Sequence, residues 1–311
     1  MSLKEKKGKT VLVTGPNGFI GRQLILDLKK QHPDWKIKVI SRNPVEGVSG
    51  FLSFEDFCLG KFEDSYFDDI NHLVHLAALA HRFSTISIED LKTVNIDFLT
   101  KVLSQLKMGV IEKIVFMSSY SVSLLERNIV LDTVDYAITK QKGELLLRSW
   151  FESNLKRCEI VILRPAMVYG CGAPGNFERL LGLLKKPLPL PFGGFKFPRS
   201  FIHVKNLTSA VVSVLEAPLH RGLWVWDIAD PWRETFIGFV EDLKRTISGQ
   251  SKLINFPVSL FGIGLKLIGK HNLYQKMTLS FEIDSKVFAQ QYKWDPPVKF
   301  EQRFEELRSN K

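Results

Sequence analysis

The sequence has few cysteines and nothing that looks like a metal site. Only Cys58, Cys158 and Cys171 occur among its 311 residues, and none belongs to a CxxC pair. An odd, sparse set of cysteines suits a reducing compartment, so we expect a cytoplasmic protein without a disulfide framework and without a bound metal. The lysine-rich leader over residues 4–9 has no apolar core, which argues against a secretory signal.

Long apolar runs are also missing. The longest, residues 254–268, is interrupted by Pro257, two glycines and Lys266. It is shorter than the roughly 20 apolar residues that a membrane span needs. We therefore predict a buried or half-buried helix here and no stable membrane insertion. A helix lying in the membrane interface is the alternative.

Positive charge exceeds negative charge, with 43 Lys and Arg against 33 Asp and Glu and a net charge of +10. This balance suits an acidic ligand, a nucleic acid or an anionic membrane surface. The basic residues are scattered and form no recognisable nucleic-acid-binding module, so we expect no nucleic-acid partner. Attraction for an anionic nucleotide is the simpler interpretation.

The first half of the chain alternates short β-branched apolar segments with segments of helical period. Strands are predicted at 10–14, 36–40, 72–76, 114–117 and 160–163, and helices at 19–30, 88–107 and 133–151. This alternation predicts an α/β fold with a doubly wound parallel sheet of the Rossmann type. We assign residues 1–170 to a dinucleotide-binding domain. Residues 171–311 are assigned to a smaller α/β substrate-binding portion, partly interleaved with the first.

A glycine loop joins the first predicted strand to the first predicted helix. In TGPNGFIGRQL, Gly15, Gly18 and Gly21 follow the strand and open the helix. Small residues let the backbone approach a pyrophosphate, and the helix N-terminus supplies N–H donors and positive potential. The strand–turn–helix context favours a dinucleotide-binding loop over a plain turn.

The end of the second predicted strand bears on the type of cofactor. An acid at this place binds the ribose 2′-hydroxyl of NAD, whereas an arginine accommodates a 2′-phosphate. The segment reads VISRNP, with Ser41 and Arg42 and no acid. We therefore favour NADP(H). NAD remains possible if Arg42 is only a surface residue.

A tyrosine and a lysine lie four positions apart in DYAITK. Tyr136 and Lys140 share one face of a predicted helix, and a nearby ammonium is expected to lower the pKa of the phenol for proton transfer. The preceding strand ends in FMSSYS, which places Ser119 at its carboxyl end, where ligands bind in open α/β sheets. Its hydroxyl is expected to hydrogen-bond the reacting substrate oxygen. Turn or helix-cap chemistry is the alternative for both serines and stays open for Ser118.

Seven segments resemble the extended short-chain dehydrogenase/reductase family of sugar-nucleotide epimerases, dehydratases and reductases. They are TGPNGFIG, HLAALAH, VN, FMSS, YAITK, LRPAMVYG and RSFIHVKNL, in the family's order. The resemblance implies that Ser119, Tyr136 and Lys140 form a catalytic triad. The full predicted cofactor site comprises Gly15, Asn17, Gly18, Phe19, Ile20, Gly21, Ser41, Arg42, Ala77, Ala78, Asn95, Tyr136, Lys140, Pro165 and Val168.

The resemblance also implies a substrate site. Asn176 and Arg199 fall where the family holds the nucleotide diphosphate, and a guanidinium binds phosphate bidentately. Together with His81 and Ser119 they are the predicted substrate-binding residues. The alternatives are a helix N-cap for Asn176, a surface charge for Arg199 and an exposed loop histidine for His81.

A narrower likeness covers GNFERLLGLLKKPLPLPFGG and the RSFIHVKNL that follows. It resembles bacterial enzymes that reduce UDP-4-keto-sugars to N-acetylquinovosamine-type products for surface polysaccharide. Ser123-Leu124 stands where the family often has tyrosine and glycine, and Ala137 where glycine is common. Tyr120 and Ser121 stand where family dehydratases have an Asp-Glu pair, so dehydration is not expected.

Three functions follow from these observations. We favour NADP(H)-dependent reduction of a UDP-4-keto-6-deoxy-hexosamine, with a UDP-sugar as partner and a homodimer formed through helices 88–107 and 133–151. An NAD-dependent UDP-hexose 4-epimerase is the alternative. A non-catalytic dinucleotide-binding sensor or assembly subunit ranks lower, because such relatives usually lose the tyrosine or the lysine.

Overall fold

The structure, a computed structural model, describes residues 8–79, 88–129, 134–154, 157–267, 269 and 271–308. Its main sheet is parallel and, within those residues, has seven strands in the order β10-β6-β5-β4-β1-β2-β3. The strands are β1 (Thr10–Thr14), β2 (Lys36–Ser41), β3 (Gly50–Ser53), β4 (His72–His75), β5 (Lys113–Met117), β6 (Glu159–Pro165) and β10 (Gly222–Ile228). The strand order reverses between β1 and β4, so the predicted doubly wound Rossmann-type fold is confirmed.

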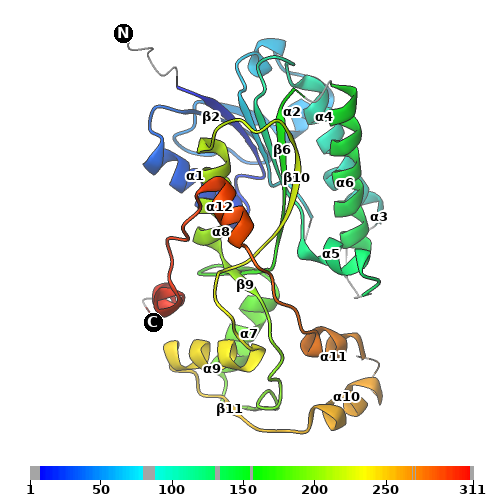
Figure 1. Ribbon diagram of the computed structural model, residues 1–311, viewed down its shortest axis with the longest axis vertical. Coiled ribbons are helices and arrows are strands. Elements are labelled where there is room, and N and C mark those ends of the chain that lie inside the picture. The colour runs from blue at the N-terminus through cyan, green and yellow to red at the C-terminus, as the bar shows by residue number, and fades with distance from the viewer. Residues whose placement is uncertain are drawn as a thin grey trace.

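Helices cover both faces of this sheet (Figure 1). One face carries α1 (Phe19–Gln31), α8 (Val204–Glu216) and α12 (Lys286–Tyr292), and the other carries α2 (Phe54–Leu59), α4 (Phe98–Gln105) and α6 (Val134–Ser153). Both faces of β1 are buried because alternate side chains enter different cores. Val11 and Val13 pack with α1 and α8, whereas Leu12 packs with α4 and α6. A strand buried on both sides explains the unbroken apolar run TVLVT.

The helix predicted over residues 88–107 is present over residues 88–105, but its middle turn is π-helical. The structure has α3 (Ile88–Lys92), a π-helical turn (Thr93–Asp97) and then α4. The π turn contains Asn95, whose amide oxygen accepts from the Leu79 backbone N–H at 3.0 Å and whose Nδ2 donates to Thr139 on α6 at 3.1 Å. Single π turns are frequent at functional sites. The predicted homodimer through these helices stays a prediction.

Several segments after residue 166 build a second, smaller part at the lower end of Figure 1. It contains α7 (Asn176–Lys185), α9 (Phe236–Thr246), α10 (Val258–Leu267), α11 (His271–Thr278) and two short parallel pairs, β7 (Met167–Tyr169) with β9 (Phe201–His203) and β8 (Pro189–Leu190) with β11 (Lys252–Leu253). A phenylalanine-rich core holds it together, with Phe177, Phe201 and Phe239 buried. Since α8 and β10 lie with the main sheet, the chain passes between the two parts several times. The division at residue 170 stays a prediction.

Short helices complete the chain: α5 (Tyr120–Glu126) follows β5, and 3-10 turns occur at Asp64–Phe67, Phe300–Gln302 and Glu305–Leu307. The apolar run 254–268, expected to be buried or half-buried, forms α10, whose outward side is exposed at Leu260, Ile263 and Leu267. The helix is therefore half-buried, as predicted: Leu265 is buried on its inward side, and none of the described residues covers its outward side. Of the helices in the described ranges, none combines the length and apolar character required to cross a bilayer.

Candidate active site

The glycine loop is shaped by two close backbone approaches. Gly15 has φ of +71°, and a Cβ there would lie 2.8 Å from the amide nitrogen of Ala77. A Cβ at Gly21 would lie 2.2 Å from the carbonyl oxygen of Gly15. The loop can therefore fold only with glycine at both places. Gly18 occupies the N-cap of α1 and, among the described residues, no side chain caps this end, which leaves its first N–H groups for an anion.

A pocket of about 460 Å³ opens beside this loop, at the carboxyl ends of β1, β2 and β4. Predicted cofactor residues that line it are Gly15, Asn17, Gly18, Ser41, Arg42, Ala77 and Ala78. Residues that the sequence reasoning missed also line it: Ile40, Asn43, Phe54, Leu76, Leu79, Asp90, Thr93, Val94 and Phe98. A crevice at the point where strand order reverses is where open α/β sheets bind dinucleotides, and the glycine cradle fits one.

The turn after β2 forms one wall of the pocket. The Ser41 hydroxyl donates to the carbonyl oxygen of Asn43 at 2.6 Å, and the Asn17 amide donates to the same oxygen at 2.8 Å. Arg42, which lies between Ser41 and Asn43 in the sequence, is exposed and lines the pocket. Asn43 could have been predicted as a pocket residue, because it follows Ser41, the last residue of β2, by only two positions.

The remaining predicted cofactor residues pack around the loop. Both Phe19 and Ile20 are partly buried. Ile20 packs against the core between the sheet and helices α1 and α8, and Phe19 packs against the phenylalanine-rich core of the smaller part. Pro165 ends β6, and Val168 lies in β7, where it pairs with Ile202 of β9. Their contact with a cofactor stays a prediction.

Lys140 joins α6 to the carboxyl end of β5. Its Nζ donates to the carbonyl oxygen of Met117 at 2.7 Å, and its side chain is buried. Because Ser119 follows Met117 by two residues, the lysine and the serine lie at the same strand end. Tyr136 lies one turn earlier on α6 and is partly exposed. Its backbone carbonyl accepts a hydrogen bond from the Thr139 hydroxyl, which in turn accepts one from the Asn95 amide. The π turn and α6 are thus held together beside the glycine loop.

The helix-cap role left open for Ser118 belongs instead to Ser119. Ser119 is the N-cap of α5: its Oγ accepts from the Ser121 N–H at 3.2 Å. Ser118 is buried and donates to Glu144 Oε1 at 2.5 Å. Cap chemistry therefore belongs to Ser119 and not to Ser118. The Ser119 hydroxyl also donates to Ser121 Oγ at 3.1 Å, so it must turn from Ser121 to donate to a substrate oxygen, and its catalytic role stays a prediction.

The protonation of the tyrosine and lysine differs from expectation. Burial raises the pKa of the Tyr136 phenol above its ordinary value of 10, so the expected lowering by Lys140 is wrong for this structure. Burial also lowers the pKa of Lys140 to about 7, against the opposing effect of the Glu144 carboxylate. The physical reason is that the lysine is desolvated and directed at a carbonyl, so it supplies little positive charge to the phenol.

We expect Tyr136 to ionise above pH 10 in the protein without a dinucleotide, because burial favours the neutral phenol. The measurement is an ultraviolet titration of phenolate absorbance, in which the wild-type curve minus the Tyr136→Phe curve isolates this residue. A difference curve with its midpoint below pH 10 would show that Lys140 does activate the phenol.

A buried ion-pair network lies behind the lysine. Glu144, one turn beyond Lys140 on α6, pairs with Arg164 of β6 at 2.6 Å. Arg164 also pairs with Glu126 of α5 at 2.7 Å, and its Nη1 donates to Ser123 at 3.1 Å. Sequence reasoning missed this network. The available signal was spacing, since Tyr136, Lys140 and Glu144 repeat every four residues on one face of a helix.

Residues 11–225 match the NAD dependent epimerase/dehydratase family. The chain belongs to this family. It is therefore an NAD(P)-dependent enzyme, which confirms the likeness to extended short-chain dehydrogenases/reductases. A UDP-glucose 4-epimerase of Vibrio cholerae is 26% identical over 97% of this chain and 95% of its own.

Solved structures share the fold at lower identity. The UDP-N-acetylglucosamine 4-epimerase from Methanobrevibacter ruminantium M1, in complex with UDP-N-acetylmuramic acid, has a TM-score of 0.70 and 22% identity over 97% of this chain and 96% of that one. The UDP-glucuronic acid 4-epimerase from Bacillus cereus, in complex with UDP-glucuronic acid and NAD, has a TM-score of 0.70 and 21% identity over 96% and 99%. Both solved structures therefore have the same overall fold as this chain.

Two of the predicted substrate residues, Asn176 and Arg199, lie in the smaller part. Asn176 is the exposed first residue of α7, whose N-cap is Gly175, so the N-cap alternative for Asn176 is wrong. Arg199 lies over the rings of Phe281 at 5.5 Å and Phe236 at 6.0 Å, and burial lowers its pKa to about 10. A guanidinium held between two rings is not a simple surface charge. His81 lies outside the described residues.

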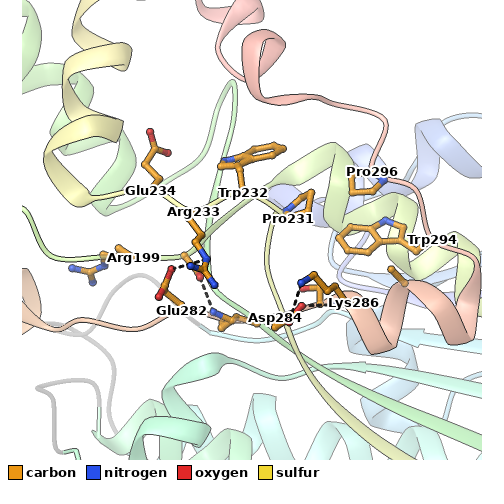
Figure 2. Close-up of a pocket in the computed structure, with 14 residues that line it drawn as sticks. Arg199, Pro231, Trp232, Arg233, Glu234, Glu282, Asp284, Lys286, Trp294 and Pro296 are labelled. Carbon is orange, nitrogen blue, oxygen red and sulfur yellow. Dashed lines mark hydrogen bonds and ion pairs between the residues drawn. The ribbon is translucent and has the colours of Figure 1, made fainter.

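Arg199 also borders a second cavity, of about 200 Å³. Figure 2 shows its guanidinium turned away from the tryptophans and from Lys286 that line the rest of this cavity. Two acids of this cavity pair with cations that also line it, Glu282 with Arg233 at 3.5 Å and Asp284 with Lys286 at 3.8 Å, whereas Glu234 pairs with Arg303 at 2.6 Å. Within the described residues, no group of three His, Cys, Asp or Glu side chains is placed to hold a metal ion.

Proposed function

We propose that this protein reduces the 4-keto group of a UDP-4-keto-6-deoxy-hexosamine with NADPH, for bacterial surface polysaccharide. Arg42 carries the proposal: it is exposed, follows β2 and lines the pocket beside the glycine loop. An arginine at this place accommodates a 2′-phosphate, whereas an acid would bind the 2′-hydroxyl of NAD. The strand itself ends in Ser41, whose hydroxyl is engaged with Asn43.

The bound cofactor supplies a hydride, and this chain's residues bind it and handle the proton. The glycine loop and α1 hold the pyrophosphate, while Ala77, Ala78 and Asn95 border the dinucleotide. Tyr136 donates its proton to the C4 oxygen, and Ser119 hydrogen-bonds the same oxygen. Tyr136 carries its proton at neutral pH, as the reductive direction requires. Lys140 positions the tyrosine's helix at the end of β5.

The diphosphate of the substrate is assigned to Arg199 and Asn176, and His81 stays a predicted substrate residue. Arg199 is desolvated against Phe236 and Phe281, which strengthens its attraction for an anion. Asn176 starts a helix whose N-terminus favours negative charge.

The second candidate is an NAD-dependent UDP-hexose 4-epimerase. It is favoured by the 26% identity, over almost the whole chain, to a UDP-glucose 4-epimerase. An epimerase must first remove a proton from the substrate hydroxyl, so it needs a phenol that ionises readily.

The experiment gives purified protein a UDP-4-keto-6-deoxy-N-acetylhexosamine with NADPH and follows the loss of NADPH absorbance. Parallel reactions contain UDP-glucose or UDP-N-acetylglucosamine, analysed for their C4 epimers. Net NADPH oxidation coupled to reduced sugar supports the proposal. Epimer interconversion with retained NAD and no net NADPH loss would replace it with the second candidate.

Arg42→Ala is expected to raise the KM for NADPH roughly tenfold to a hundredfold and to leave the KM for NADH nearly unchanged. The basis is the loss of a charge-assisted hydrogen bond to the 2′-phosphate. Arg233→Ala is the matched control, because Arg233 is exposed and lies in the other part of the molecule. Equal changes for both cofactors would show that Arg42 does not select the 2′-phosphate.

A further inference from the structure

Helix α10 is apolar on both sides, although only one side is packed. Its inward side is fixed by Phe261, whose ring meets Phe195 at 5.5 Å, and by buried Leu265. Its outward side carries Leu260, Ile263 and Leu267, with 54%, 56% and 83% of their surfaces exposed. A helix that is apolar all round is normally buried in protein or in lipid.

Two more apolar side chains extend this surface. Ile254 and Phe256, just before α10, are 42% and 37% exposed. We call Ile254, Phe256, Leu260, Ile263 and Leu267 the α10 patch. Isolated exposed leucines are normal, but a run of them along one element marks an interaction surface. Figure 1 shows α10 at the end of the molecule farthest from the N-terminus, clear of the main sheet.

The backbone under the α10 patch is held in place. The Gly193 N–H donates to the Ile254 carbonyl at 3.0 Å, and Lys252 pairs with Pro189 between β11 and β8. A Cβ at Gly194 would lie 2.7 Å from the Phe256 carbonyl oxygen, so the two segments touch closely. The patch is thus a fixed projection of the smaller part of the fold.

The sequence that contains the α10 patch is basic. Between Asp242 and Glu282 the sequence contains six basic residues and no acid: Lys244, Arg245, Lys252, Lys266, Lys270 and Lys276. This short stretch therefore contributes more than half of the chain's net charge of +10. Lys252 and Lys266, which flank the patch in sequence, are both exposed.

We propose that the α10 patch docks this protein onto an anionic phospholipid surface. The apolar side chains enter the boundary between headgroups and acyl chains, and the surrounding lysines contact lipid phosphates. A second copy fits this surface less well, because two patches brought together would bring the exposed Lys252 and Lys266 of both copies close to one another. The proposal rests on α10 and its charge alone, and not on the reaction proposed above.

The test floats the full chain with vesicles of phosphatidylcholine alone or mixed with phosphatidylglycerol. Binding is expected only to the anionic vesicles, and it should weaken as salt is added. Ile263→Glu/Leu267→Glu should lower the bound fraction about tenfold or more, since it removes two apolar side chains from the lipid boundary. Lys252→Gln/Lys266→Gln, which changes only exposed groups, should lower it about tenfold.

Leu26→Glu is the control, because Leu26 is 62% exposed on α1, away from α10. It should bind vesicles like the wild type, and all variants should keep the wild-type Tm and NADPH affinity. Absence of flotation, or equal flotation with neutral vesicles, overturns the proposal. So does a dimer, measured by sedimentation, that Ile263→Glu/Leu267→Glu dissociates in the absence of lipid.

Discussion

Tyr136→Phe is expected to lower kcat by a factor of about a thousand, while the affinity for the dinucleotide stays the same. The phenol is the proton donor to the C4 oxygen, and phenylalanine keeps the ring but removes the proton. Its raised pKa means that the wild-type residue is protonated and ready to donate at neutral pH. Single-turnover kinetics separates this step from binding, and cofactor fluorescence measures affinity.

Tyr120→Phe is the matched control for this variant. Tyr120 directly follows Ser119, is buried, and its hydroxyl accepts from Arg127 at 3.2 Å. Removing that hydroxyl costs about 1 kcal/mol of stability and no proton transfer, so kcat should change little. Equal losses of kcat in both variants would mean that Tyr136 acts through packing, and the assignment of the proton donor would fail.

Strand positions and their parallel arrangement were predictable from the sequence because burial on both faces produces short runs such as TVLVT and KIVFM. Right-handed crossovers then restrict the order in which such strands are assembled. The glycine loop was predictable for a related reason. The close backbone approaches at Gly15 and Gly21 exclude every other residue type, so the loop is visible in the sequence as glycines at these positions.

Other features depend on tertiary contacts that leave no local pattern. The π turn around Asn95 forms because its side chain bridges Leu79 and Thr139, which lie far apart in sequence. Which serine caps α5 is decided by where β5 ends and by a buried carboxylate on α6. An apolar period likewise predicts helix α10 but does not indicate whether protein covers both of its sides.

Glu144→Ala is expected to destabilise the protein by about 3–5 kcal/mol, because it leaves the Arg164 guanidinium in the interior with one carboxylate fewer. Glu144 is 3% exposed and accepts two hydrogen bonds from Arg164, at 2.9 and 2.6 Å. Urea unfolding measures the change. Glu126→Ala is the control: this carboxylate pairs with the same arginine but is 47% exposed, so its loss should cost about 1 kcal/mol or less.

A double variant separates the two effects of Glu144. In Glu144→Met/Arg164→Met both buried charges are gone, so most of the lost stability should return. The carboxylate that raises the pKa of Lys140 is still missing, however, and the pKa of that lysine should fall further below about 7. If the lysine must be charged to position Tyr136, the double variant will fold well yet lose activity as the pH rises through neutrality, at a lower pH than the wild type does. Identical pH profiles would reduce Glu144 to a purely structural residue.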